Sequence, residues 1–230
     1  MKKLIAIILA AVLCLCGLAG CAKEPSEPEA IRGLSPERSM ELAYATEFAV
    51  DYYAGGYKLI TLGDGSRFLV IPEGGALPDG IANDITPLYQ PVENIYLAAT
   101  SAMCLFDALD RLDAIRLSGS KPESWYIENA RAAMEAGSIL FAGKYSEPGS
   151  EMLIDQGCDL AIESMMIGHA SEVKDKLEEF GIAVLVDQSS NESHPLGRTE
   201  WIRLYGAILN EEEAADAIFD TDDTVLLAAR

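Results

Sequence analysis

The feature that most constrains the fold is the alternation of strand-like and helix-like segments along residues 95–209. It is clearest in residues 94–120, where an apolar strand turns through Thr100 and Ser101 into a helical pattern and then a second strand. Either hydroxyl is a natural N-cap for that helix. Taken alone, this unit is an ordinary βαβ motif. Its repetition predicts a single Rossmann-like α/β lobe, a mostly parallel sheet flanked by helices, over residues 91–210.

A β-rich extension precedes this lobe, at residues 39–90. Residues 57–62 and 67–71 are strand-like and flank the turn Gly63-Asp64-Gly65-Ser66. Two such segments around a glycine-rich turn predict a β-hairpin, so we expect a small antiparallel region before the α/β lobe. Residues 211–219 begin one more helix, whereas residues 221–230 do not resemble the continuation of a long helix.

In a parallel sheet, the loops that follow the strands meet at one edge, and open α/β sheets bind their ligands there. These loops lie at residues 99–101, 118–126, 164–169 and 188–198. Polar and aromatic side chains at such an edge fit recognition of a bulky ligand better than chemistry on a small one. The candidate ligand-binding residues are Thr100, Ser101, Lys121, Trp125, Tyr126, Glu163, Met166, His169, His194 and Arg198.

The chain's two histidines, His169 and His194, both fall in these loops. A histidine pair can bind a metal, respond to pH, or belong to ordinary loops. No HExxH, CxxC or Ser-His-Asp spacing is present, so we assign no catalytic residue, metal site or cofactor. Two alternatives remain: a lipid-anchored enzyme using both histidines with Glu163, and an extracellular adhesion or scaffold domain whose acidic surface meets a basic partner.

The first 21 residues match a lipoprotein signal. Lys2 and Lys3 precede an apolar run at residues 4–15, and Leu18-Ala19-Gly20 leads to Cys21. This pattern predicts a signal peptide at residues 1–20 and lipidation of Cys21, which would anchor the chain on the outer face of the cell membrane. The alternative is a plain secretory signal with a chance cysteine. Residues 21–38 are rich in Glu, Pro and Ser and predict a flexible tether.

The net charge of −20 excludes some partners. A chain this acidic repels phosphates, which argues against nucleic-acid binding. It also repels an anionic membrane surface, so membrane attachment must be covalent or inserted. Cys104 and Cys158 are most simply small buried apolar residues, and a disulfide between them stays open.

Four segments together resemble a known family. They are residues 94–119 (NIYLAATSAMCLFDALDRLDAIRLSG), 150–162 (SEMLIDQGCDLAI), 177–187 (LEEFGIAVLVD) and 198–215. In order and spacing, behind a lipoprotein signal, they resemble the substrate-binding lipoproteins of ABC importers for iron complexes and cobalamin. Cys158 stands where that family has a proline.

The resemblance implies a binding protein without a catalytic step, which delivers a ferric siderophore, haem or cobalamin to a membrane permease and its ATPase. Glu151 matches the glutamate with which the family's N-terminal lobe docks on the permease; the simpler interpretation is a favourable charge near a helix N-terminus. The family's second lobe is missing here, and residues 211–230 match only the start of the helix that joins the lobes. We therefore expect a truncated form with weak or absent ligand binding.

Overall fold

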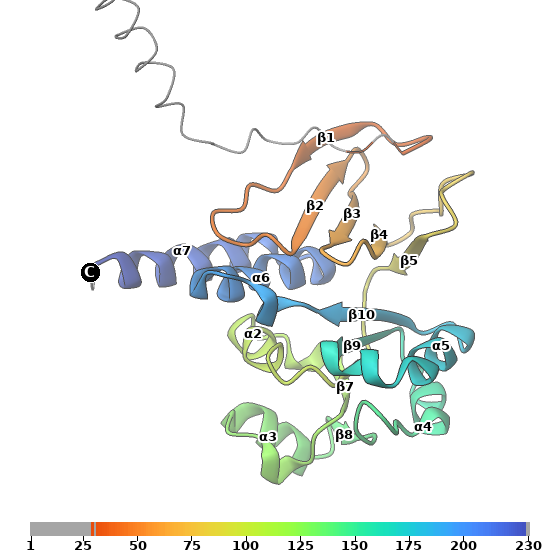
Figure 1. Cartoon of the computed structure of the whole chain (residues 1–230), viewed down its shortest axis with the longest axis vertical. Helices are drawn as coiled ribbons and strands as arrows, with labels where there is room; N and C mark the ends of the chain where they lie inside the picture. Colours follow the sequence, from red (N-terminus) through yellow and green to blue (C-terminus); the bar gives the residue numbers. More distant parts are fainter. Residues whose placement is uncertain (1–28, 30, 229–230) are drawn as a thin grey trace, which may run out of the picture.

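The computed structural model describes Glu29 and residues 31–228, in which two five-stranded sheets lie on either side of a pair of long helices (Figure 1). The predicted signal peptide at residues 1–20 and the predicted lipidation site, Cys21, lie outside the described residues. The first sheet has the order β1-β2-β3-β4-β5 and is antiparallel except for its last pair, which is parallel. Its strands are β1 (Pro36–Ser39), β2 (Phe48–Tyr53), β3 (Tyr57–Leu62), β4 (Arg67–Ile71) and β5 (Ile85–Tyr89).

The second sheet has the order β10-β9-β6-β7-β8, and each of its pairs is parallel. This confirms the α/β fold and the parallel sheet expected from the alternating pattern. The antiparallel hairpin expected before it is also present, as β3 and β4. The strands of the second sheet are β6 (Ile95–Leu97), β7 (Ile115–Ser118), β8 (Leu140–Phe141), β9 (Leu160–Ser164) and β10 (Ala183–Asp187).

Helices cover both faces of the parallel sheet because its strands are apolar on both sides. One face, with Leu160 and Ile162 of β9, packs in the largest core cluster with α2, α3 and α6. The other face, with Ala161, packs in a smaller cluster with α4 and α5. The helices are α2 (Met103–Ala108), α3 (Glu128–Glu135), α4 (Ser150–Asp155), α5 (Ser171–Glu179), α6 (Pro195–Leu209) and α7 (Glu212–Ala228).

Helix α6 joins the two sheets through buried carboxylates. Glu200 accepts backbone hydrogen bonds from Ala43, Tyr44 and Ala45 at 2.7–2.8 Å, although about 155 residues separate the partners in sequence. Glu192, just before α6, accepts in the same way from Thr46 N at 2.9 Å. Without these acceptors the loop between β1 and β2 would leave N–H groups without partners, which is costly in a buried position.

Two sequence expectations about the ends of the fold are wrong. Strand β1 pairs with β2, and Ile31 lies in a core cluster, so residues 31–38 belong to the fold rather than to a flexible tether. The last helix runs to Ala228, past residue 221 where we expected helical structure to stop. Among the described residues, no helix is long and apolar enough to cross a membrane.

Candidate functional site

The parallel sheet has a topological switch point between β6 and β9. From β6, the chain adds β7 and β8 on one side, and then β9 and β10 on the other. Loops that leave the sheet in opposite directions open a crevice at this point, which is the usual ligand position in open α/β sheets. At this point Ala98 N and Ala99 N both donate to Ile162 O, at 2.9 and 3.0 Å, so the end of β6 is held against β9.

The loop after β6 places Thr100 and Ser101 on the surface, where a ligand can reach both. The expectation that one of them caps the next helix is wrong. The N-cap of α2 is Ala102, which is fully buried and has no side-chain hydrogen bond to the helix. Helix α2 has only six residues, which is too short for its N-terminus to serve as a binding site. The polar groups on this side of the switch point are therefore the hydroxyls of Thr100 and Ser101.

The loop after β7 separates its two aromatic residues. Trp125 is buried against the main core and donates from Nε1 to Ser118 Oγ at 3.3 Å, so it is not on the rim where we expected it. Tyr126 is 97% exposed and can stack on a flat ligand. Lys121 is exposed, with its Nζ 5.8 Å from the centre of the Phe141 ring. This loop therefore offers one cation and one aromatic ring.

Glu163 is the second-to-last residue of strand β9, at its end towards the switch point, and it is fully buried. Neither carboxyl oxygen has a hydrogen-bond partner. Burial favours the neutral form and raises the pKa of Glu163 to about 8. The carboxyl also contributes to the raised pKa of Tyr96, after the larger effect of burial on that phenol. Glu163 is thus a protonated acid beneath the edge at neutral pH, and a ligand does not reach it directly.

The loop after β9 is exposed. Its 3₁₀ turn, Met165–His169, begins with Ser164 Oγ accepting from Met166 N at 3.4 Å. Met166 is 48% exposed and His169 is also exposed, so both side chains face solvent beside the switch point. A thioether and an imidazole are groups that can contact an apolar or metal-bearing ligand.

The loop after β10 uses its histidine structurally. His194 Nδ1 accepts from Leu196 N at 3.1 Å and so caps α6, and its ring stacks on Tyr44 at a centroid distance of 4.6 Å. A helix start was predictable here, because Pro195 occupies the first position of α6. Arg198 is exposed and donates to Ser190 O at 3.2 Å, which leaves most of its guanidinium available.

The residues of the enzyme alternative do not form a hydrogen-bonded group. Glu163 bonds to neither histidine, and His194 is engaged with Tyr44 and the α6 backbone. Within residues 31–221, no three His, Cys, Asp or Glu side chains cluster as metal ligands. Both described cysteines are free; Cys158 is buried as expected, but Cys104 is exposed, contrary to expectation.

One loop of this edge was missed from the sequence. Strand β8 ends at Phe141, so residues 142–149 leave the same edge as the other four loops. Tyr96 donates to Gly143 O at 2.9 Å, which holds this loop against the end of the sheet. The apolar segment 138–142 is the sequence signal for this strand, but the strand itself has only two residues, Leu140 and Phe141.

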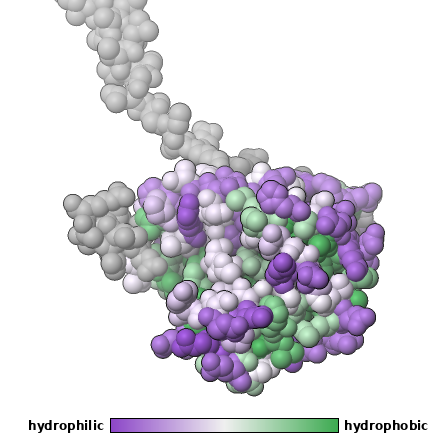
Figure 2. Space-filling view, turned by 60° about the horizontal axis from the view of Figure 1, so that its bottom comes forward, coloured by the Kyte–Doolittle hydropathy of each residue, from purple (hydrophilic) through white to green (hydrophobic). Residues whose placement is uncertain are grey.

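Glu151 is exposed in the first turn of α4. Figure 2 brings the end of the molecule with α3, β8 and α4 forward and shows hydrophobic side chains gathered between hydrophilic areas. The exposed hydrophobic residues of these elements include Phe141, Met152 and Ile154, which are 39%, 38% and 51% exposed. Glu151 therefore lies beside an exposed apolar side chain, that of Met152.

Two cavities lie away from the strand-end edge. One, of about 560 Å³, lies between the edge strands of the two sheets, β5 and β10. The other, of about 530 Å³, lies between the first sheet and helices α6 and α7.

No family model matches this chain. An uncharacterized lipoprotein of Methanocaldococcus jannaschii is 22% identical over an alignment 251 positions long, gaps included, which covers 96% of this chain and 60% of that protein.

Solved haem- and siderophore-binding proteins resemble part of the chain. They include the haem-binding protein HutB of Vibrio cholerae, with 20% identity, a TM-score of 0.46, and coverage of 59% of this chain and 48% of that one. The petrobactin-binding protein YclQ of Bacillus subtilis has 12% identity, a TM-score of 0.45, and coverage of 57% and 44%. The catecholate-siderophore-binding protein VctP of V. cholerae has 19% identity and a TM-score of 0.44, with coverage of 60% of this chain and 46% of that one. This chain thus spans less than two thirds of the length of each protein named here.

Proposed function

We propose that this chain is the ligand-recognition part of a substrate-binding lipoprotein of an ABC importer, which captures an iron complex and passes it to a membrane permease. The observation that carries the proposal is the switch point of the parallel sheet. Exposed Thr100 and Ser101 stand on one side of it, and exposed Met166 and His169 stand on the other. Such an arrangement suits binding of a bulky ligand across the loops.

The ligand class follows from the groups that this edge exposes. Lys121 and Arg198 provide two cations on an otherwise acidic protein, which suits an anionic ferric siderophore. Tyr126 can stack on a catecholate or porphyrin ring, and His169 can ligate haem iron. A ferric catecholate siderophore satisfies the cations and the aromatic ring together, so we place it first, with haem and cobalamin as the other ligands of the class.

The lipid anchor is part of the same proposal. Residues 1–20 and Cys21 carry the lipoprotein pattern, and the M. jannaschii relative is named a lipoprotein. We infer that Cys21 is acylated and holds the domain on the outer face of the membrane. Growth with radioactive palmitate tests this: the chain should be labelled, and Cys21→Ser should abolish the label. Equal labelling of both forms would refute the anchor site.

Ligand capture is tested by titrating the chain with a ferric tricatecholate siderophore, haem and cyanocobalamin while following the fluorescence of its two tryptophans, Trp125 and Trp201. Because one edge of loops contacts only part of a ligand, we expect a Kd weaker than about 1 μM. Lys121→Met and Arg198→Met should each weaken siderophore binding by about tenfold, since each removes a charged contact. Arg131→Met, on exposed α3, is the matched control. The sequence alone allowed weak or absent binding, whereas the exposed groups of this edge favour weak binding, so absence of binding by all three ligands would refute the proposal.

Glu151 is proposed to contact the permease. Glu151→Arg reverses its charge on an exposed helix, so transport of the ligand should fall while the Kd of the chain for that ligand stays unchanged. Glu172→Arg is a close control, because Glu172 is also exposed in the first turn of a helix, α5. Equal uptake by the wild type and both variants would remove Glu151 from the docking surface.

A further inference from the structure

The cavity between β1, β2 and the α6–α7 pair is a second candidate binding site, separate from the strand-end edge. Its volume of about 530 Å³ lies in the range of small-molecule sites. Both charge signs line it, and no sequence motif or proposed role accounts for them. The lining residues that matter are Arg38, Met40, Glu41, Tyr52, Arg203 and Asp216.

The wall of this cavity is formed before any ligand arrives. Residues 40–43 make one side, and Glu200 fixes the end of this segment by accepting from Ala43 N at 2.8 Å. Arg203 Nη1 donates to Glu41 O at 3.1 Å and holds the middle of the same segment against α6. A wall held by a buried carboxylate and a guanidinium loses little conformational entropy when a ligand binds.

One end of the cavity presents a cation. The guanidinium carbon of Arg38 lies 3.7 Å from the centre of the Tyr52 ring, which is itself only 8% exposed. Among the described residues, no carboxylate lies within ion-pair distance of Arg38. The nearby carboxylate of Glu212 is instead paired with Lys58. Arg38 is therefore a guanidinium oriented by Tyr52, with which it also shares a side-chain hydrogen bond, and its remaining donors are available to a carboxylate.

The other end carries excess negative charge. The guanidinium of Arg203 meets three carboxylates, those of Glu200, Asp216 and Asp220, at 3.2, 3.0 and 3.1 Å. Of these three carboxylates, that of Asp216 lines the cavity. Glu41 adds a further exposed carboxylate, which has no ion pair among the described residues. This end attracts a cationic group such as an ammonium.

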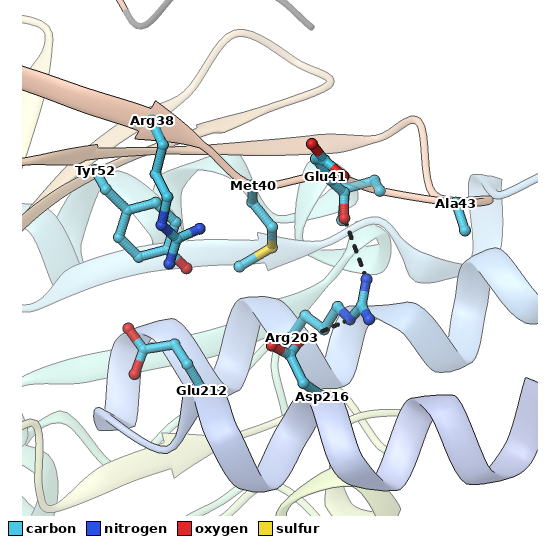
Figure 3. A pocket seen from close by; sticks show the side chains of 9 residues that line it. Arg38, Met40, Glu41, Ala43, Tyr52, Arg203, Glu212 and Asp216 are labelled. Carbon is cyan, nitrogen blue, oxygen red and sulfur yellow. Dashed lines mark hydrogen bonds and ion pairs between the residues drawn. The ribbon is translucent and has the colours of Figure 1, made fainter. Parts of the chain in front are cut away.

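We propose that this cavity binds a small zwitterion, an α-amino acid or a short peptide, with its carboxylate at Arg38 and its ammonium at Asp216 and Glu41. Figure 3 shows Arg38 and Tyr52 at one end of the cavity, Asp216 and Glu41 toward the other, and the Met40 side chain between them. Met40 offers an adaptable apolar contact for the aliphatic part of such a ligand. A purely anionic or purely cationic ligand would leave one end of the cavity without its counter-charge.

Isothermal titration calorimetry of the chain with the free L-α-amino acids and glycyl-leucine tests the proposal. At least one should bind with a Kd between about 10 μM and 1 mM, as expected for a small ligand with two charged contacts. Its N-acetyl and C-amide forms should each bind at least about tenfold more weakly, because each lacks one charge. No heat from any probe at about 10 mM, or equal binding of the blocked forms, would overturn the proposal.

Variants locate the site. Arg38→Met keeps the stem on Tyr52 but removes the charge, and should weaken binding by about tenfold; Glu41→Gln should weaken it by about threefold. Arg131→Met and Glu135→Gln, on exposed α3, are the matched controls and should bind as the wild type does. The thermal midpoint of each variant verifies folding, and Glu41→Gln alters only an exposed side chain. If all four variants bind equally, the zwitterion binds elsewhere and the assignment of this cavity is wrong.

Discussion

Replacing Glu163 by glutamine should remove a large part of the pH dependence of this protein's stability. The Glu163 side chain is fully buried, neither of its oxygens has a hydrogen-bond partner, and burial raises its pKa from 4.5 to about 8. In the unfolded chain the same carboxyl ionises near its ordinary pKa. Between these two values the folded state holds a proton that the unfolded state has released, so stability falls as pH rises.

The magnitude follows from the two pKa values. The slope is about 1.4 kcal/mol per pH unit, and over the whole interval the loss is about 5 kcal/mol. Between about pH 5 and pH 7, Glu163 alone should lower the free energy of unfolding by about 2.5 kcal/mol. This is a substantial share of the 5–15 kcal/mol typical of a whole domain. Glutamine has nearly the same shape and does not ionise, so Glu163→Gln should lack this contribution.

Urea unfolding followed by circular dichroism gives the free energy at each pH for the wild type, Glu163→Gln and the exposed control Glu135→Gln. Asp159 also has a pKa raised by burial, but it is present in all three proteins, so the difference between them isolates Glu163. The quantity to compare is the free energy of unfolding of Glu163→Gln minus that of the wild type. This difference should be about 3 kcal/mol larger at about pH 7 than at low pH.

Parallel pH profiles for the wild type and Glu163→Gln would refute this reasoning. They would mean that water or a cation satisfies the carboxylate in the folded protein, so that burial does not keep it protonated. A control variant that changed the profile as strongly as Glu163→Gln would show that the effect belongs to net charge rather than to this site.

Three further outcomes follow from the buried polar contacts and the thiols. Glu200→Ala removes the acceptor of three backbone N–H groups and should lower the free energy of unfolding, measured in urea, by about 3–5 kcal/mol. The control Glu213→Ala changes an exposed side chain and should leave the free energy of unfolding nearly unchanged. Lys58→Met removes the donor to Ala207 O and should cost about 1–3 kcal/mol, measured as a lower midpoint in thermal unfolding. A thiol reagent should modify Cys104 in the native protein and Cys158 only in denaturant, since Cys158 is buried and its pKa is raised to about 12 by burial; rapid modification of both would contradict the structure.

The candidate site was predictable where it depends on strand order. Strand-helix alternation implies a parallel sheet, and a parallel sheet brings the loops after its strands to one edge. That rule predicts the position of Tyr126, His169 and Arg198, whose side chains are exposed at this edge. The same rule does not predict the position of the Trp125 side chain, because its loop turns the indole back onto the core and towards Ser118. Whether a loop side chain points inward depends on the cavity it finds there, and local sequence carries no signal for that.

His194 shows a different limit. Its position in a loop after a strand suggested a ligand contact, yet it caps α6 and stacks on Tyr44, which is 150 residues earlier in the chain. The cap could have been inferred from Pro195 at the start of the helix. The stacking could not, because it requires the first sheet to be docked against α6, and only the assembled core determines that docking.

The sequence by itself determined the local pattern of apolar strands, amphipathic helices and the turn glycines of the β3–β4 hairpin, because each depends on neighbouring residues and their periodicity. The tertiary structure decided the ionisation of Glu163 and the partners of Glu200, and it formed the charged cavity beside Arg38 and Arg203. These features arise where segments distant in sequence exclude water from one another. Burial then sets the energy of a charge, and no local pattern records which charges will be buried.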